Sequence, residues 1–184
     1  FPGLPAVVEE AELIAKSFAP TQLMDDTFLK DDLENTFLRN DYRYVHIASH
    51  GQFSGDAAST FVLTYDDYLT LDDLENLIRP SSYRGAPVEL LTLSACQTAA
   101  GDDKAALGLA GVAIKAGARA ALASLWFVSD QASALMVDEF YRALSKPGTS
   151  KAQALMHAQT VLRNDPRFRH PRYWAPYIMI GNWL

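Results

Sequence analysis

Apolar stretches that read as fully buried strands alternate along this chain with helical patterns. Residues 44–48, 88–93 and 120–125 are almost entirely apolar, and residues 177–180 repeat the pattern near the end of the chain. A strand without polar alternation is covered on both faces, as in a parallel sheet. Strands of this kind separated by helices fold into a mostly parallel sheet between helical layers. We therefore expect an α/β protein, a three-layer α/β/α sandwich with a mostly parallel sheet.

The helical patterns end at residues suited to helix boundaries. Ser150 opens the last long helix with a capping box, and Gly117 closes a helix of small residues. The helix that begins after Thr70 is expected to stop at residues 79–82, and the helix after residue 128 is expected to start from Ser129 or Asp130. Helices are predicted at residues 7–18, 29–39, 71–78, 107–116, 130–144 and 151–163, and short extended pieces at residues 22–24 and 61–65.

Length and charge limit the classes of protein to which the chain can belong. Its 184 residues are close to one domain of about 150, so we expect a single core. The formal charge is −6, and the sequence contains no basic cluster that could follow a phosphate backbone. Both observations argue against nucleic acid as a direct ligand. The apolar stretch 107–127 is interrupted by Lys115 and Arg119, so no membrane association is expected. The opening segment resembles a loop inside a longer protein.

Two predicted strands end in residues that could carry chemistry. The first leads into His50 and Gly51, and a later one leads into Cys96, the only cysteine, 46 positions further on (96 − 50). The carboxyl ends of parallel strands share one edge of a sheet. A thiol has an ordinary pKa of about 8.5 and needs a neighbouring base to act as a nucleophile at neutral pH, which His50 could supply. The backbone N–H groups of Gly51 and Cys96 could then hold the oxyanion.

Simpler interpretations of the same residues stay open on this evidence alone. A free cysteine at a buried strand end is commonly a small core residue, and a histidine on a strand is commonly structural. A lone cysteine also forms no disulfide within the chain, which favours a reducing compartment, and we expect a cytoplasmic location.

Four segments of the chain carry a resemblance to a known family. They are VHIASHG at residues 45–51, LTLSACQTAAG at 91–101, ALGLAGVAIKAGARAALASLW at 106–126 and HPRYWAPYIMIGNWL at 170–184. In this order and spacing they resemble the CHAT domain. CHAT domains are caspase-like cysteine peptidase modules, related to separases and metacaspases, that commonly lie at the C-terminal end of bacterial proteins with tetratricopeptide repeats.

The resemblance implies a caspase-like fold and a catalytic pair. The family's histidine falls on His50 and its cysteine on Cys96, although this chain has ASHG and SACQT where many relatives have ATHG and SACET. Relatives have a further central strand before the position of Phe1. We therefore expect residues 1–184 to be a single CHAT domain without its first strand, the C-terminal part of a larger protein.

Weaker predictions concern substrate binding, metals and cofactors. Ser94 and Asp130 are candidates to line the pocket for the residue that precedes the cleaved bond, although a helix N-cap is the simpler role for Asp130. His157 and His170 have no partners at metal-ligand spacing and no phosphate-binding loop appears, so neither a metal nor a cofactor is expected. Trp126, like the other tryptophans, is expected in the core or in a pocket wall.

Three functions are compatible with these observations. The favoured one is a cysteine endopeptidase that hydrolyses peptide bonds through an acyl-enzyme, with a protein or peptide substrate and a repeat domain or regulatory protein as its partner. The main alternative is a catalytically silent module that keeps the caspase fold and serves a repeat protein in interaction or signalling. The third is a flavodoxin-like binding domain, which predicts a bound flavin.

Overall fold

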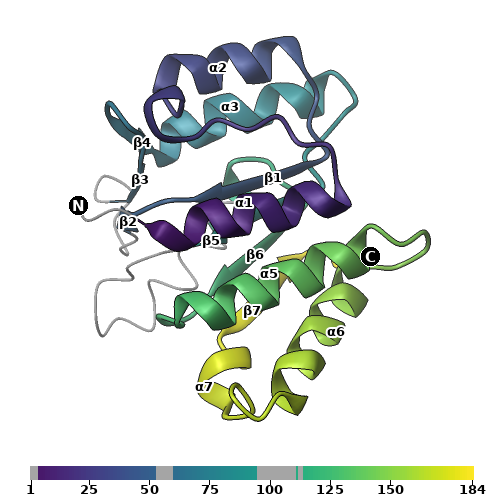
Figure 1. Cartoon of the computed structure of the whole chain (residues 1–184). Helices are drawn as coiled ribbons and strands as arrows, with labels where there is room; N and C mark the ends of the chain where they lie inside the picture. Colours follow the sequence, from purple (N-terminus) through teal and green to yellow (C-terminus); the bar gives the residue numbers. More distant parts are fainter. Residues whose placement is uncertain (1–3, 53–59, 95–110, 112–113) are drawn as a thin grey trace. The chain divides into compact units, whose positions relative to one another are not determined.

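The computed structural model describes residues 4–52, 60–94, 111 and 114–184 (Figure 1). Its contacts separate into two compact units. The sheet unit holds Leu23–Phe127 and Ile180–Asn182, and the helical unit holds the residues up to Gln22 together with Val128–Met179 and Trp183–Leu184. Cys96 lies outside the described residues.

A mostly parallel sheet forms the centre of the sheet unit. Its strands are β1 (Tyr44–Ala48), β5 (Leu90–Ser94), β6 (Ala120–Ser124) and β7 (Tyr177–Gly181), in the order β1-β5-β6-β7. β5 runs parallel to both β1 and β6, with Tyr44 opposite Leu90 and Leu91 opposite Ala121. The last residues of β7, Ile180 and Gly181, belong to the sheet unit. The α/β class with a mostly parallel sheet is therefore confirmed.

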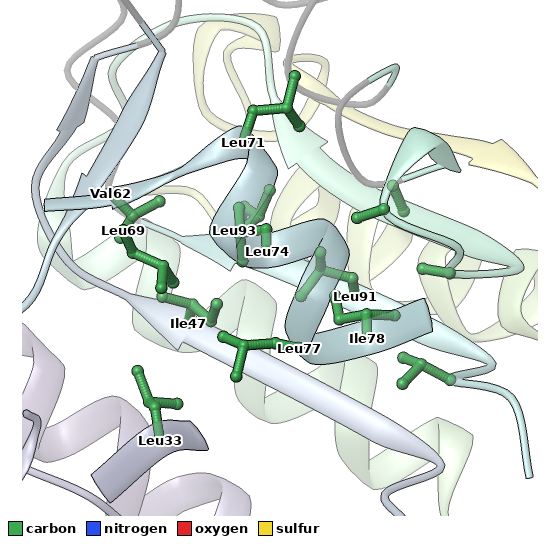
Figure 2. Packing of buried hydrophobic residues seen from close by; sticks show 14 of the residues in the cluster. Leu33, Ile47, Val62, Leu69, Leu71, Leu74, Leu77, Ile78, Leu91 and Leu93 are labelled. Carbon is green, nitrogen blue, oxygen red and sulfur yellow. The ribbon is translucent and has the colours of Figure 1, made fainter. Parts of the chain in front are cut away.

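The central strands β5 and β6 are buried almost throughout, with apolar side chains on both of their faces, whereas β1 and β7 are mostly half-buried. One face of the sheet packs against α2 (Lys30–Arg39) and α3 (Leu71–Tyr83). Leu74, Leu77 and Ile78 of α3 lie over this face (Figure 2). Leu91 and Leu93 of β5 belong to this core, and Leu90 and Thr92, which alternate with them, are buried as well. The absence of polar alternation in these strands correctly predicted that both faces are covered.

A small antiparallel sheet follows the carboxyl end of β1. It consists of β2 (Gly51–Gln52), β3 (Phe61–Leu63) and β4 (Tyr68–Thr70) in the order β2-β3-β4. The sequence predicted only one extended piece here, at residues 61–65. The turn after β3 is closed by Thr64, whose Oγ1 donates to the Asp67 carbonyl at 2.7 Å and accepts from the Asp67 N–H at 3.0 Å.

The helical unit consists of helices that pack along one another. α1 (Pro5–Ser17) and α6 (Lys151–Asn164) both contact α5 (Asp130–Leu144), and the short α7 (Pro171–Trp174) contacts α6 (Figure 1). Glu139 of α5 is buried and bonded to Arg142, and its Oε2 lies 2.9 Å from His157 Nε2 on α6. Burial acts to raise the pKa of Glu139, but the hydrogen bonds from Arg142 and His157 outweigh it and lower that pKa. The carboxylate thus ties α5 to α6 in its charged form.

Two boundary predictions need correction. Residues 22–24 join no sheet in the described part of the chain, although Met24 itself is extended, because a strand also requires a pairing partner. α3 does not stop at Pro80 but continues to Tyr83, since Ser81 is buried and its Oγ donates to the Ile78 carbonyl at 2.7 Å. The burial of Ser81 and its hydrogen bond help to compensate for the backbone donor that proline lacks.

The remaining elements agree with expectation. The capping box at Ser150 and Gln153 is present, and Gly117 has the positive φ of a helix C′ residue. Of the helix predicted at residues 107–116, the part before residue 111 lies outside the described residues. Within the described part of the chain, no helix has both the length and the apolar character needed to cross a membrane.

The Asp73 carboxylate generates a prediction about stability and pH. Its Oδ2 accepts from Thr70 N–H at 2.8 Å, Thr70 Oγ1 at 2.7 Å and Lys30 Nζ at 2.9 Å. Burial acts to raise the pKa of Asp73, but these hydrogen bonds outweigh it and lower that pKa. A lowered pKa in the folded state contributes stability above the unfolded pKa of about 3.9, and that stability is lost as the pH falls further. We expect Asp73→Asn to lower the free energy of unfolding by about 1–2 kcal/mol at pH 7.

The control for this variant is Asp72→Asn. Asp72 is the exposed neighbour in the same first turn of α3, so its substitution removes the same charge near the helix N-terminus. Denaturant titrations at pH 7 and pH 3 should give a larger loss for Asp73→Asn than for Asp72→Asn at pH 7, and a smaller difference between the two at pH 3. Equal losses at both pH values would contradict the role of the hydrogen bonds.

Gly181 generates a second prediction. This residue ends β7 at φ +96, and a Cβ there would lie 2.4 Å from the Arg119 carbonyl oxygen. Gly85 has a similar φ of +80 with nothing within 4 Å of the corresponding position. We expect Gly85→Ala to cost about 1 kcal/mol from backbone strain alone, and Gly181→Ala to cost more because the Cβ also clashes. Equal shifts of the two variants in chemical denaturation would show that β7 does not approach β6 so closely.

Candidate active site

The candidate active site lies where three neighbouring strands end together. Ala48, the last residue of β1, is opposite Ser94, the last residue of β5. Leu93 is opposite Ala123, so Ser94 and Ser124, the last residues of β5 and β6, are level with each other. The three strands therefore end level with one another at one edge of the sheet, where ligands of parallel sheets usually bind.

The backbone around His50 is held by hydrogen bonds on both sides. Ser49 N–H donates to the Ser94 carbonyl at 3.4 Å, so the pairing of β1 with β5 continues one residue past β1. Leu63 N–H of β3 donates to the His50 carbonyl at 2.8 Å, and Ser49 Oγ donates to the Leu63 carbonyl at 2.6 Å. His50, which is half-buried, therefore stands at the junction of the two sheets.

Gly51 is buried in β2 opposite Val62 of β3. In an antiparallel pair, hydrogen-bonded and non-hydrogen-bonded positions alternate. Because Leu63 N–H donates to the His50 carbonyl, Gly51 and Val62 form a non-hydrogen-bonded pair, and the N–H of Gly51 points away from β3. The Gly51 N–H therefore takes no part in the hydrogen bonds between β2 and β3.

Two hydrogen bonds hold the β3–β4 turn against the start of α2. Tyr65 N–H donates to the Phe28 carbonyl at 2.9 Å, and Lys30 N–H donates to Asp66 Oδ1 at 3.1 Å. The backbone hydrogen bond from Lys30 is the main cause that lowers the pKa of the Asp66 carboxyl. The side-chain hydrogen bond to Asp73 raises the pKa of Lys30. These contacts fix β3, the strand that in turn holds the His50 carbonyl.

The other predicted site residues fall in different parts of the molecule. Ser94 is half-buried at the end of β5, in the sheet unit with His50 and Gly51. Cys96 follows two positions later, outside the described residues, so its roles stay predictions. Asp130 belongs to the helical unit, and its role in substrate binding also stays a prediction.

The expectation that Asp130 is the N-cap of a helix was wrong. The N-cap of α5 is Ser129, which has the extended backbone (φ −63, ψ 145) of a residue just outside a helix. Asp130 is exposed and already helical, so its carboxylate instead lies in the first turn, where the helix dipole favours a negative charge.

Sequence patterns did not indicate two features of this site. The bonds that Leu63 and Ser49 make around His50 are formed mainly by backbone groups, which leave no residue signature. Trp126, expected in the core or a pocket wall, is 41% exposed directly after β6, which excludes the core. Among the described residues, no group of three or more histidine, cysteine, aspartate or glutamate side chains is arranged to hold a metal ion.

Comparison with known proteins identifies relatives over part of the chain. Tetratricopeptide repeat protein 28 from Homo sapiens is 33% identical over 98 residues, which are 52% of this chain and 4% of that protein. The Mus musculus protein of the same name is 34% identical over 97 residues, again 52% of this chain and 4% of its own length. The chain thus corresponds to a small fraction of the length of these relatives.

The family comparison covers nearly all of the chain. The model of the CHAT domain matches residues 1–182. This range includes both the motif that contains His50 and Gly51 and the motif that contains Cys96. The match agrees with the parallel sheet, whose strands β1 and β5 lead into these motifs. The chain therefore belongs to the CHAT domain family of the caspase-like superfamily.

Proposed function

We propose that this domain is a cysteine endopeptidase that uses His50 and Cys96 as a catalytic pair. One observation supports the pairing above all. β1 and β5 are paired with an offset of 46 residues, as in Tyr44 opposite Leu90 (90 − 44), and His50 and Cys96 are also 46 residues apart (96 − 50). Each of the two residues stands two positions after the paired strand ends, Ala48 and Ser94.

The proposed reaction has two steps. In the first, the Cys96 thiolate attacks the peptide carbonyl carbon, a C–S bond forms, the C–N bond breaks, and His50 gives a proton to the leaving amine. In the second, His50 takes a proton from water, the resulting hydroxide equivalent attacks the thioester carbonyl, and the C–S bond breaks to release the acid and the thiolate. The overall reaction consumes one water for each peptide bond.

Gly51 is proposed to stabilise the oxyanion together with the backbone N–H of Cys96. The orientation of its N–H, away from β3, supports this role, because that donor takes no part in the ladder with Val62. A glycine also lets a substrate carbonyl approach the backbone closely. Rigid donors of this kind stabilise the charge that develops in the transition state.

Further proposals concern substrate binding, partners and location. Ser94 ends the strand that leads into Cys96, which supports a place beside the bound peptide. Asp130 opens α5, and the family resemblance supports a role for it in substrate binding. The repeat proteins among the relatives support a repeat domain or a regulatory protein as partner, and the single cysteine supports a reducing, cytoplasmic compartment.

The test of this function compares peptide hydrolysis by the wild type with hydrolysis by Cys96→Ala and His50→Ala. We expect each substitution to lower the rate on a fluorogenic peptide panel by about 10³-fold or more, because the two groups act as one unit. His170→Ala serves as the matched control, since His170 caps the short helix α7 in the helical unit. It should retain the wild-type rate.

A second measurement distinguishes chemistry from a folding defect. The rate at which a peptidyl electrophile modifies Cys96 should fall in His50→Ala at pH 7, because a thiol with its ordinary pKa of about 8.5 is mostly protonated there. Circular dichroism should show all variants folded. Equal cleavage of the panel by the wild type, Cys96→Ala and His50→Ala would contradict this mechanism. Resistance of Cys96 to labelling in the wild type would favour the catalytically silent interaction module.

A further inference from the structure

Two exposed apolar side chains lie at neighbouring helix ends in the sheet unit. Leu38 of α2 is 72% exposed, and Tyr83, the last residue of α3, is 82% exposed. Side chains this exposed leave apolar area in water, and contact with another surface would remove that area. A single exposed apolar side chain is ordinary on a protein surface, so the pair is informative only if the two helix ends lie together.

Arg84 joins the two helix ends. Its Nε donates to Asp41 Oδ1 at 2.8 Å, and its Nη2 donates to the Phe37 carbonyl at 3.3 Å. Phe37 directly precedes Leu38 on α2, and Arg84 directly follows Tyr83 on α3. The hydrogen bonds of Arg84 therefore bring both exposed side chains to one area of the surface. Figure 1 agrees, because α2 and α3 run side by side and end where β1 begins.

This area of the surface is already ordered. The Arg84 N–H donates to the Pro80 carbonyl at 3.2 Å, which closes the end of α3. Beneath the end of α2, the ring of the buried Phe37 lies 5.4 Å from the ring of Tyr42, which packs against the same core. A surface that is ordered before binding loses little conformational freedom when a partner binds.

The same area is positively charged within an acidic unit. We call residues 38–43 and 82–87 the docking surface. Its charged side chains are Arg39, Arg43, Arg84 and Asp41, which give a formal charge of +2 (3 − 1). The carboxylate of Asp41 is already paired with Arg84. The whole sheet unit has 8 lysine and arginine residues and 15 aspartate and glutamate residues, a formal charge of −7 (8 − 15). The docking surface therefore favours an acidic partner.

Charge and size argue against a second copy of this chain as the partner. In a symmetric dimer the same surface packs against itself, so the three arginines of one copy would face those of the other and repel them. A stable interface also buries about 800 Å² on each partner, which is more than two apolar side chains supply. Tyrosine and arginine are enriched among the residues that contribute most to binding at interfaces. These features fit a short segment of another protein region.

We propose that the docking surface binds a short acidic protein segment, with an apolar side chain of that segment packed between Leu38 and Tyr83 and its carboxylates paired with the neighbouring arginines. The docking surface precedes β1 and β5, whereas the candidate active site follows them. Each of these strands has five residues, a length of about 16 Å. Binding at the docking surface thus leaves the active-site edge open and does not depend on the proposed catalytic pair.

The test begins with a display library of random peptides of about 12 residues. The library is first depleted on the double variant Leu38→Ala/Tyr83→Ala, and the remaining peptides are selected on the wild type. Both side chains are mostly exposed, so their truncation leaves the fold intact. The selected peptides should be enriched in aspartate and glutamate and should each contain a large apolar residue, because these groups match the arginines and the apolar pair.

Fluorescence anisotropy then measures the affinity of the labelled selected peptides. Leu38→Ala, Tyr83→Ala and Arg39→Glu should each weaken binding by about 10-fold. Two matched controls should bind as the wild type does. Tyr65→Ala removes another exposed aromatic side chain of the sheet unit, 67% exposed in the β3–β4 turn. Lys146→Glu makes the charge change of Arg39→Glu at an exposed position of the helical unit.

Several outcomes would overturn the proposal. They are a selection that yields no binding peptide, selected peptides without acidic and apolar enrichment, and equal affinities of the wild type and the docking-surface variants. Labelled single-stranded RNA is the competing probe. Tighter binding of this RNA than of the selected peptides, lost in Arg39→Glu and Tyr83→Ala, would assign the surface to nucleic acid instead. None of these results bears on peptide hydrolysis by the proposed catalytic pair.

Discussion

The pairing of β1 with β5 is the constraint on which the rest of the site depends. Five consecutive residue pairs, from Tyr44 opposite Leu90 to Ala48 opposite Ser94, set the positions at which the two strands end. A shift of one residue would turn every side chain of β1 to the other face of the sheet, and would remove Ile47 from the core beneath α2 and α3. The energy of the core therefore fixes the register, and the register fixes which residues leave the sheet together.

The small antiparallel sheet adds precision that the main sheet cannot supply. β1 ends at Ala48, so His50 lies beyond its last paired residue and would be free to vary if nothing else held it. Its carbonyl is instead bonded to Leu63 of β3, and β3 leads into a turn that Lys30 and Asp66 attach to α2. α2 covers the sheet, and the hydrogen bonds between its N-terminus and the β3–β4 turn also help to position the chain that follows β1.

The sequence predicted the elements whose signal is local and periodic. The bounds of β1 were predicted to the residue and α5 was predicted from near Asp130 to Leu144, because a short apolar run and a helix start leave clear patterns. The strand expected at residues 22–24 and the stop expected at Pro80 were wrong, because pairing and packing with distant residues decide both. For the same reason no pattern indicated that Leu63 bonds to His50. The two residues are 13 positions apart (63 − 50), and a backbone hydrogen bond can form between residues of almost any type.

Three neighbouring strands of the sheet are followed in the sequence by different kinds of residue. The proposed nucleophile follows β5 and the proposed acid follows β1, whereas two exposed aromatic residues, Trp126 and Phe127, follow β6, on the far side of β5. The buried parts of all three strands contribute to one core, so substitutions there affect the position of every functional group at once. Substitutions of Trp126 and Phe127 change only exposed side chains and leave the register of β1 and β5 intact.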